Sequence, residues 1–254
     1  MNDTTNSNNT AQNQPNQQET KQKKIVNMFD DIAKTYDLAN RILSFGIDKY
    51  WRKKACDLAY NFYGKKELDQ IVDVACGTGD MCDYWLKRAD ANNINLTNIT
   101  GVDPSVGMLG VAKQKLPDIA FEEGRATELP FGDDKADIIS ISYGIRNVME
   151  REEAFQEFHR VLKKDGLLVI LEFTKNEQEG IGDHLREFYM KKILPFIGKL
   201  ISNHKDAYDY LPNSIDGFAT TQKLQSELKD AGFEPIMVQG FSLKISTLFI
   251  FKKV

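Results

Sequence analysis

The sequence is poor in the two residue types that most often build metal centres and covalent frameworks. Three cysteines and three histidines occur in 254 residues. They are Cys56, Cys76, Cys82, His159, His184 and His204. The cysteines are odd in number, and neither residue type shows metal-ligand spacing, so we predict no disulfide framework and no metal site. Unpaired thiols are typical of a reducing compartment, which indicates a cytoplasmic protein.

Long apolar runs and an excess of positive charge are also absent. No uncharged apolar segment is long enough to span a bilayer, and the net charge of -4 argues against a general nucleic-acid binder. The first 20 residues are almost entirely Asn, Gln, Thr and Ser, and they do not resemble a secretory signal. We expect a disordered polar tail over residues 1–23 and one domain over residues 24–254.

A short glycine-containing motif is the feature around which the remaining chain can be ordered. The apolar run Ile71–Val74 suits a buried strand and breaks at Gly77 and Gly79 before a helical pattern resumes at Asp80. Glycine lets the backbone take left-handed dihedrals and lets a ligand approach the amides at the helix start. About two dozen residues on, a second apolar stretch ends at Asp103, whose carboxylate could hold a ribose diol. Together these features predict a nucleoside-binding crevice.

Two classes of nucleoside ligand use such a crevice, and one position separates them. The dinucleotide fingerprint needs a third glycine three positions after the second, where this chain has Cys82. Asp80 at the helix start also suits an uncharged or cationic ligand better than a pyrophosphate. S-adenosylmethionine has a ribose and a sulfonium but no phosphate, so the motif favours it. A nicotinamide oxidoreductase and a chance glycine turn remain the alternatives.

Strand and helix patterns alternate beyond this motif. We expect strands at Ile99–Asp103, Ile119–Glu123, Ala136–Ser142 and Leu167–Phe173, with helices at Pro104–Leu116 and Glu152–Leu162. A helix over Thr221–Ala231, closed by Gly232, precedes two closing strands at Ile236–Phe241 and Ser246–Phe251. The second closing strand is expected to be antiparallel because its connection is too short for a crossover. The pattern predicts an α/β fold with a doubly wound, mostly parallel seven-stranded sheet that binds ligands at the carboxyl ends of its strands.

Segments outside this alternation are expected to cover the ligand. Residues 24–62 have the pattern of a helical cover with a turn at Ser44–Gly46. Residues 177–217 are expected to form a lid or substrate insertion. Within it, residues 183–202 have one broad apolar face, lysines elsewhere, and Pro195 as the expected kink. A lid packed on the core and an interfacial helix that touches a membrane both fit this pattern.

Several further stretches carry a resemblance to a known family. They are Asp73–Asp80, Ala126–Phe131, Ser142–Val148, Met28–Asp37 with Leu43–Ile47, and Tyr210–Ile215. Together they resemble the ubiquinone/menaquinone biosynthesis C-methyltransferases over nearly all of the chain after the tail. The glycine loop is shared by all class I methyltransferases, whereas Arg146-Asn147 and the N-terminal run are specific to this family. The resemblance implies a Rossmann-like fold and transfer of a methyl group from S-adenosylmethionine to a ring carbon of a prenylated demethylquinol.

The resemblance also implies where the cofactor is held. The positions are Asp73, Gly77, Thr78 and Gly79 in the glycine loop, Asp103 at the ribose, Arg125 and Ala126 beside adenine, and Ser142 at the end of the fourth strand. Arg125 departs from the family, which usually has Asn or Asp there, and a guanidinium has no acceptor for the adenine amino group. Either the backbone recognises adenine or Arg125 stacks on it.

The catalytic candidates follow from the chemistry of ring methylation. A ring carbon becomes nucleophilic when the adjacent hydroxyl ionises, so the site must favour a phenolate. Arg146 is a candidate to stabilise that charge or to hold a water that takes the proton, and Asn147 is a candidate to orient the hydroxyl. Tyr36 and Asp37 of the N-terminal cover are further catalytic candidates. A helix-start salt bridge and cap is the alternative interpretation of Arg146 and Asn147.

The implied partner is a prenylated quinol lipid, and no nucleic acid is expected. Peripheral contact with the inner face of a membrane and a homodimer are further hypotheses. A methyltransferase for another small molecule would keep the same cofactor residues. A non-catalytic adenosine-binding protein would bind the cofactor and transfer nothing. Naphthoquinol and benzoquinol rings both fit the pattern.

Overall fold

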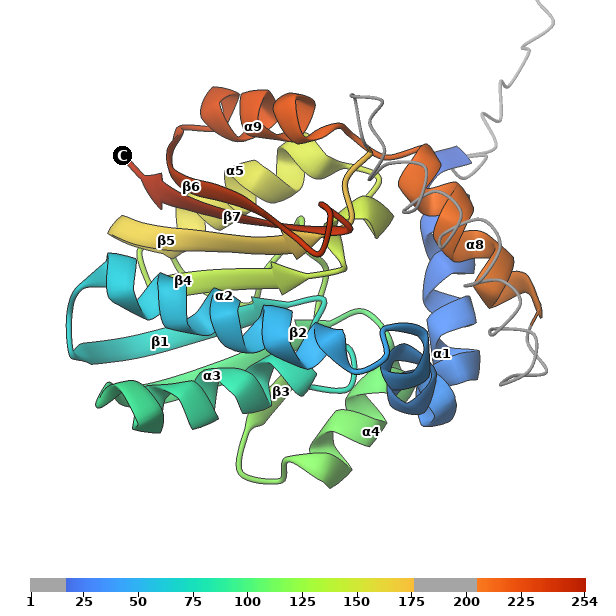
Figure 1. Ribbon diagram of the computed structural model, residues 1–254, viewed down its shortest axis with the longest axis horizontal. Helices are drawn as coiled ribbons and strands as arrows, with labels where there is room; N and C mark the ends of the chain where they lie inside the picture. Colours follow the sequence, from blue (N-terminus) through green and yellow to red (C-terminus); the bar gives the residue numbers. More distant parts are fainter. Residues whose placement is uncertain (1–16, 176–204) are drawn as a thin grey trace, which may run out of the picture.

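Parallel strands rich in branched apolar residues form the centre of the molecule (Figure 1). The computed structural model describes residues 17–175 and 205–254. The strands there are β1 (Glu67–Val74), β2 (Asn95–Asp103), β3 (Ala120–Glu123), β4 (Ala136–Ser142), β5 (Leu162–Glu172), β6 (Phe233–Phe241) and β7 (Ser246–Lys253). These described residues form one seven-stranded sheet in the order β3-β2-β1-β4-β5-β7-β6. Strands β1 to β5 pair in parallel, and β7 runs antiparallel to β5 and β6, which confirms the predicted fold class.

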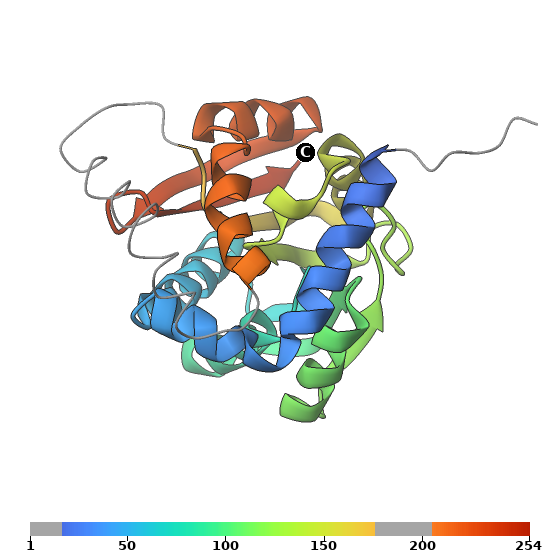
Figure 2. The ribbon, with the colours of Figure 1, turned by 90° about the vertical axis from the view of Figure 1, so that its right-hand side faces the viewer.

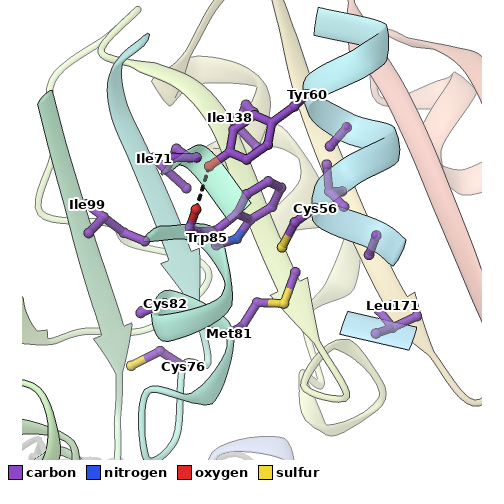
Figure 3. Close-up of a cluster of buried hydrophobic side chains, with 14 of the residues drawn as sticks. Cys56, Tyr60, Ile71, Cys76, Met81, Cys82, Trp85, Ile99, Ile138 and Leu171 are labelled. Carbon is purple, nitrogen blue, oxygen red and sulfur yellow. Dashed lines mark hydrogen bonds between the residues drawn. The ribbon is translucent and has the colours of Figure 1, made fainter. Parts of the chain in front are cut away.

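Helices α2 (Ile47–Tyr63) and α3 (Asp80–Asn92) cover one face of the sheet. Beneath them lie strand residues such as Ile71 and Ile138. Figure 3 shows Cys56 and Tyr60 of α2 next to Trp85 of α3, where the Tyr60 hydroxyl donates to the Trp85 carbonyl oxygen at 2.8 Å. All three cysteines are buried and unpaired.

Helices α5 (Arg151–Val161) and α9 (Thr221–Asp230) cover the opposite face. The strand residues beneath them, such as Val72 and Ile139, are direct neighbours in sequence of those on the first face. Because side chains alternate along a strand and both faces are covered, the strands read as continuous apolar runs. Gly232 ends the α9 segment with a φ of 90°, as expected.

Two further helices flank the carboxyl ends of the strands. Helix α4 (Val106–Lys115) begins after Ser105, whose hydroxyl accepts the amide of Met108 at 3.0 Å as an N-cap. Helix α1 (Gln17–Leu43) packs against α4 and leads into α2 through a turn. The turn contains Phe45 and Gly46 with φ values of 50° and 72°, at the predicted position.

The start of α1 differs from the expected boundary. The tail was predicted to run to residue 23, but the helix begins at Gln17. Glutamine, glutamate and lysine are good helix formers, and Glu19 in the first turn complements the helix dipole. The Gln22 side chain also accepts the backbone amide of Met149 at 3.4 Å, so this turn is held by the domain. Residues 1–16 of the predicted tail lie outside the described residues.

The predicted lid falls mostly outside the described part of the chain. The expected amphipathic helix over residues 183–202 lies there entirely, and only α8 (Lys205–Asp216) and the residue after it are described. Within residues 17–175 and 205–254, no helix has the length and apolarity to cross a membrane. The same residues contain no cluster of His, Cys, Asp and Glu suited to a metal ion.

Candidate functional site

A cavity of about 250 Å³ opens at the carboxyl ends of β1, β2 and β4. It is lined there by Ala75 after β1, Asp103 at the end of β2 and Gly144 after β4. Figure 2 views this end of the sheet, with α1 and α8 passing across it. Helix α1 contributes Glu19, Gln22, Lys23, Ile25, Val26, Asn27, Phe29 and Tyr36 to the lining. Open parallel sheets bind their ligands at this position.

The two glycines of the loop after β1 serve different purposes. Gly77 has a φ of 55°, and a Cβ there would lie 4.0 Å from Cε1 of Tyr36, an ordinary van der Waals distance. Gly79 has a φ of 81°, and a Cβ there would lie 3.0 Å from Cζ of Phe121. Both glycines therefore supply left-handed backbone to the loop, and Gly79 also allows close packing inside the protein, whereas Gly77 lies outside the cavity lining.

Asp103 is the carboxylate predicted to hold the ribose of the cofactor. It lines the cavity and is 7% exposed. Its Oδ2 accepts the amide of Gly77 and its Oδ1 accepts the amide of Ser105, both at 2.8 Å. Burial raises the pKa of Asp103 to about 6, although the two hydrogen bonds oppose the increase. The carboxylate is held rigidly, and each oxygen keeps a lone pair for a ligand hydroxyl.

Asp73, also predicted to bind the cofactor, lies in the core. Its carboxylate is 1% exposed and accepts hydrogen bonds from Ser140 at 2.6 Å and from the Cys82 thiol at 3.5 Å. The Ser140 hydroxyl in turn accepts the indole N–H of Trp85 at 2.9 Å. Burial raises the pKa of Asp73 to about 7. Asp73 does not line the cavity; it joins β1 to β4 and α3 beneath the glycine loop.

Thr78 and Asp37, predicted for cofactor binding and catalysis, contact each other. The Thr78 hydroxyl donates to Asp37 at 2.5 Å, and Lys115 at the end of α4 donates to the other oxygen of Asp37 at 2.9 Å. Lys115 also pairs with Asp80 of α3, to which Arg41 of α1 donates as well. This network fastens α1 over the glycine loop and leaves neither Thr78 nor Asp37 in the cavity lining.

The predicted adenine contacts lie on the other side of the cavity. Arg125 and Ala126 both line it. The Arg125 side chain is 49% exposed and donates to Glu150 at 3.5 Å, a long, exposed contact of the kind that stabilises little. The hydroxyl of Ser142 is buried and has no hydrogen-bond partner in the structure as described. Ser142 does not line the cavity, but a buried hydroxyl needs a partner, so it is suited to a ligand's polar group at the end of β4.

Arg146 follows β4 in a short turn, Ile145–Asn147, and is buried. Its Nη1 donates to Glu172 Oε1 at 2.7 Å and to the carbonyl oxygen of Tyr143 at 2.6 Å. Its backbone amide donates to the other oxygen of Glu172 at 3.3 Å. Glu172 ends β5 and is 0% exposed; burial raises its pKa, while the charge of Arg146 lowers it. Arg146 is thus half of a buried ion pair and is not part of the cavity lining.

Asn147 does line the cavity and is held by α8. The hydroxyl of Tyr210 donates to Asn147 Oδ1 at 2.8 Å. Next to it, Ser214 accepts Nε of Arg146 at 3.3 Å. Helix α8 therefore fixes both residues of the predicted catalytic pair.

Glu172 and Tyr210 were missed in the sequence. Glu172 had a usable signal, because it is a carboxylate that ends an apolar strand at the same sheet edge as Asp103. Tyr210 belongs to a stretch that carried the family resemblance, but nothing nearby in sequence indicated that it would reach Asn147. Tyr143, with a φ of 58°, lines the cavity, and its carbonyl oxygen accepts Nη1 of Arg146.

These residues fit S-adenosylmethionine. Asp103 offers acceptors for the ribose hydroxyls, and the Ser142 hydroxyl lacks a partner within the described residues. The cavity lining between α1 and Ala126 is largely apolar, as an adenine ring requires.

Comparison with known proteins agrees with this site. The family model described as the ubiE/COQ5 methyltransferase family matches residues 17–253. The chain is 55% identical to the Ubiquinone/menaquinone biosynthesis C-methyltransferase UbiE of Campylobacter jejuni subsp. jejuni serotype O:23/36, over 92% of this chain and 99% of that protein. It is 37% identical to the Demethylmenaquinone methyltransferase of Chlorobaculum parvum, over 90% of this chain and 92% of the relative.

A solved structure shares the fold at much lower identity. A SAM-dependent methyltransferase of Thermotoga maritima, described as a possible histamine N-methyltransferase, superposes with a TM-score of 0.57 and 18% identity. The superposition covers 91% of this chain and 100% of that one. At this identity the likeness concerns the sheet and its helices.

Proposed function

The chain belongs to the ubiE/COQ5 methyltransferase family, and we propose that it methylates a ring carbon of a prenylated demethylquinol, most simply demethylmenaquinol. It is a C-methyltransferase of quinone biosynthesis that uses S-adenosylmethionine. The observation that carries the proposal is the juxtaposition of Asp103, a buried carboxylate with free acceptor capacity, and Asn147 in the lining of one cavity. This juxtaposition supports a nucleoside site next to polar groups that can face a second substrate.

Residues that line the cavity or lie next to it divide the work of the reaction. When bound, the cofactor supplies an electrophilic methyl group. Asp103 holds the ribose and Ser142 takes up a polar group, while Arg125 and Ala126 flank the adenine. Asn147 faces the ring oxygen, and Arg146, paired with Glu172, holds the turn behind it. Positioning of this kind supplies much of the rate enhancement in transfers between two bound reactants.

The test is transfer of a labelled methyl group. Incubation with methyl-labelled cofactor and reduced demethylmenaquinol, followed by mass spectrometry of the lipid, is expected to show one added methyl on the ring. A methyltransferase for another small molecule would leave the lipid unlabelled and label a different acceptor. A non-catalytic adenosine-binding protein would bind the cofactor and label nothing.

Cofactor affinity is expected to depend on the ionisation of Asp103. Its raised pKa of about 6 means that the carboxylate is ionised above that pH and protonated below it. The protonated form loses acceptors for the ribose, so affinity should fall below pH 6 and be lower by nearly tenfold at about pH 5. Asp103→Asn should weaken binding by about 2 kcal/mol near neutral pH, the range of a charge-assisted hydrogen bond. Titration calorimetry from pH 5 to pH 8 measures both effects.

The Asp103→Asn variant is also the control for this pH dependence. Asp73 has a pKa of about 7 and would titrate in the same window. A pH dependence of cofactor affinity that persists in Asp103→Asn would arise from Asp73 or another titrating group. An unchanged affinity in a folded Asp103→Asn variant would remove Asp103 from the site.

We further propose that the protein touches a membrane surface at the junction of α1 and α2. The exposed side chains there are Leu38, Ile42, Phe45, Ile47 and Tyr50, between 38% and 68% exposed, with exposed Lys49 and Lys53 next to them on α2. Apolar side chains bordered by lysines suit an anionic lipid surface. Helix α1 also lines the cavity, so this surface would bring the site close to a lipid substrate. The homodimer and the cytoplasmic location stay predictions.

Vesicle co-sedimentation tests this surface. Phe45→Asp combined with Ile47→Asp should lower binding to phosphatidylglycerol vesicles by about tenfold, because two apolar side chains are replaced by anions. Phe62→Asp is the matched control, since Phe62 is 37% exposed at the opposite end of the same helix. Equal losses in both variants, or a wild-type protein that never sediments with vesicles, would exclude the α1–α2 junction as the membrane surface.

A further inference from the structure

The side-chain amide of Asn147 has a defined orientation. Its Oδ1 accepts the hydroxyl proton of Tyr210 at 2.8 Å, and its backbone amide donates to the carbonyl oxygen of Gly144 at 3.0 Å. A primary amide carries its acceptor and its two donors on opposite corners of one plane. With the oxygen turned to Tyr210, the NH₂ group is left for the cavity that Asn147 lines.

Tyr210 is placed to remain a donor. Burial raises its pKa, and the nearby Glu172 acts in the same direction against the opposing charge of Arg146. The phenol of Tyr210 therefore keeps its proton at pH values at which a quinol hydroxyl begins to ionise. A tyrosinate would only accept, and it would turn the amide of Asn147 around.

Helix α8 makes a second contact with the same turn, through Ser214. The Ser214 hydroxyl accepts Nε of Arg146 at 3.3 Å and donates to the carbonyl oxygen of Leu211 at 2.8 Å. Tyr210 and Ser214 are four residues apart in α8 and so lie on one face of the helix. The helix thus presents two hydroxyls to the adjacent residues Asn147 and Arg146.

We propose that Tyr210 is a positioning residue for methyl transfer, which turns the NH₂ group of Asn147 toward the cavity as the donor to the ring oxygen of the substrate. The inference rests on the proposed function and adds the direction of this hydrogen bond. An ionised ring oxygen can only accept, so a fixed donor favours it over the neutral hydroxyl, which also has to donate its proton. The arrangement lowers the pKa of the bound hydroxyl and so raises the nucleophilicity of the ring carbon beside it.

The kinetic test compares two tyrosine-to-phenylalanine variants. Tyr210→Phe is expected to lower kcat about tenfold, to leave cofactor affinity unchanged, and to move the rise of kcat to higher pH, because the ring oxygen ionises less readily. Tyr63→Phe is the matched control. It removes a hydrogen bond of the same kind, from Tyr63 to Asp137 at 2.6 Å, at the opposite end of the sheet. We expect it to leave the pH profile in place.

A double-mutant cycle shows whether Tyr210 acts through Asn147. In an Asn147→Ala background, Tyr210→Phe should cause no further loss of kcat, because the group that it orients is gone. Full additivity of the two losses would overturn the proposal. A fall in kcat with an unshifted pH profile would also overturn it, since that is the result expected of a purely structural tyrosine.

A binding measurement separates this inference from the proposed function. 1-Naphthol stands in for the quinol ring, and its ionisation can be followed by absorbance without any methyl transfer. Wild-type protein with bound cofactor is expected to lower the pKa of bound 1-naphthol, and Tyr210→Phe to reverse most of that shift. If the protein shows this behaviour but methylates no demethylquinol, the proposed function fails and the role of Tyr210 stands. Equal pKa values of bound 1-naphthol in both proteins would refute the role of Tyr210.

Discussion

A demethylquinone reduced with dithionite under anaerobic conditions is expected to be methylated, whereas the same lipid left oxidised is expected to give no methylated product. A quinone ring is electrophilic and has no hydroxyl to ionise. The quinol has two hydroxyls, and loss of one proton makes the adjacent ring carbon strongly nucleophilic. We expect the initial rates to differ by at least about a hundredfold, which corresponds to roughly 2.7 kcal/mol of activation free energy.

The requirement for prior reduction follows from the sequence as well as from the substrate. The glycine loop has Cys82 where a dinucleotide fingerprint needs its third glycine, and Cys56, Cys76 and Cys82 are all buried. The rate with the reduced lipid should rise with pH as the ring hydroxyl ionises. Air reoxidation of the reduced lipid before addition of enzyme is the control, and it should abolish the product. Equal methylation of both forms would rule out the phenolate mechanism and the roles given to Arg146 and Asn147.

Replacement of Glu172 by alanine is expected to lower the free energy of unfolding by about 3–5 kcal/mol. Glu172 is 0% exposed and lies 2.7 Å from the guanidinium of Arg146. Its removal would leave a buried positive charge without a partner. Urea unfolding of the purified variant measures the loss directly.

An exposed ion pair of the same length provides the control. Arg160 and Asp133 also lie 2.7 Å apart, but the Asp133 side chain is 73% exposed. Asp133→Ala should cost less than about 1 kcal/mol, because water replaces the lost partner. Replacing both Arg146 and Glu172 with methionine should restore much of the stability lost in Glu172→Ala, since no unpaired charge remains. Similar losses for Glu172→Ala and Asp133→Ala would show that the Arg146 pair is not desolvated.

The fold could be predicted because its signals are local and repeated. Strands covered on both faces appear as short apolar runs, such as Ile71–Val74, and helices of the right length separate them. The short connection between β6 and β7 indicated an antiparallel pair, which the structure confirms. The start of α1 could not be predicted from hydrophobic periodicity, because its first turns consist of polar residues. The helix there is stabilised by the helix propensity of these residues and by the hydrogen bond between Gln22 and the backbone amide of Met149.

The site was predictable where a residue's position along a strand determines what it faces. Asp103, Ala126 and Asn147 line the cavity because each lies at or just after the carboxyl end of a strand or in the loop beyond it. Asp73 faces the core, and strand alternation explains this, because Asp73 lies on the same face as Ile71. The partner of Arg146 could not be read from the sequence. Glu172 lies at the end of the neighbouring strand, and only the sheet pairing brings the two together.

The position of β7 has a consequence for how the chain folds during synthesis. β7 is made after β6 but pairs on both sides, between β5 and β6. Until Ser246–Lys253 has been synthesised, the edge of β5 is open and β6 has no strand beside it. An open edge of apolar strands is prone to pair with other chains. We therefore expect nascent chains that stop before Ser246 to need chaperone protection, although they already contain every residue that lines the cavity. Insertion of β7 should be a late folding event.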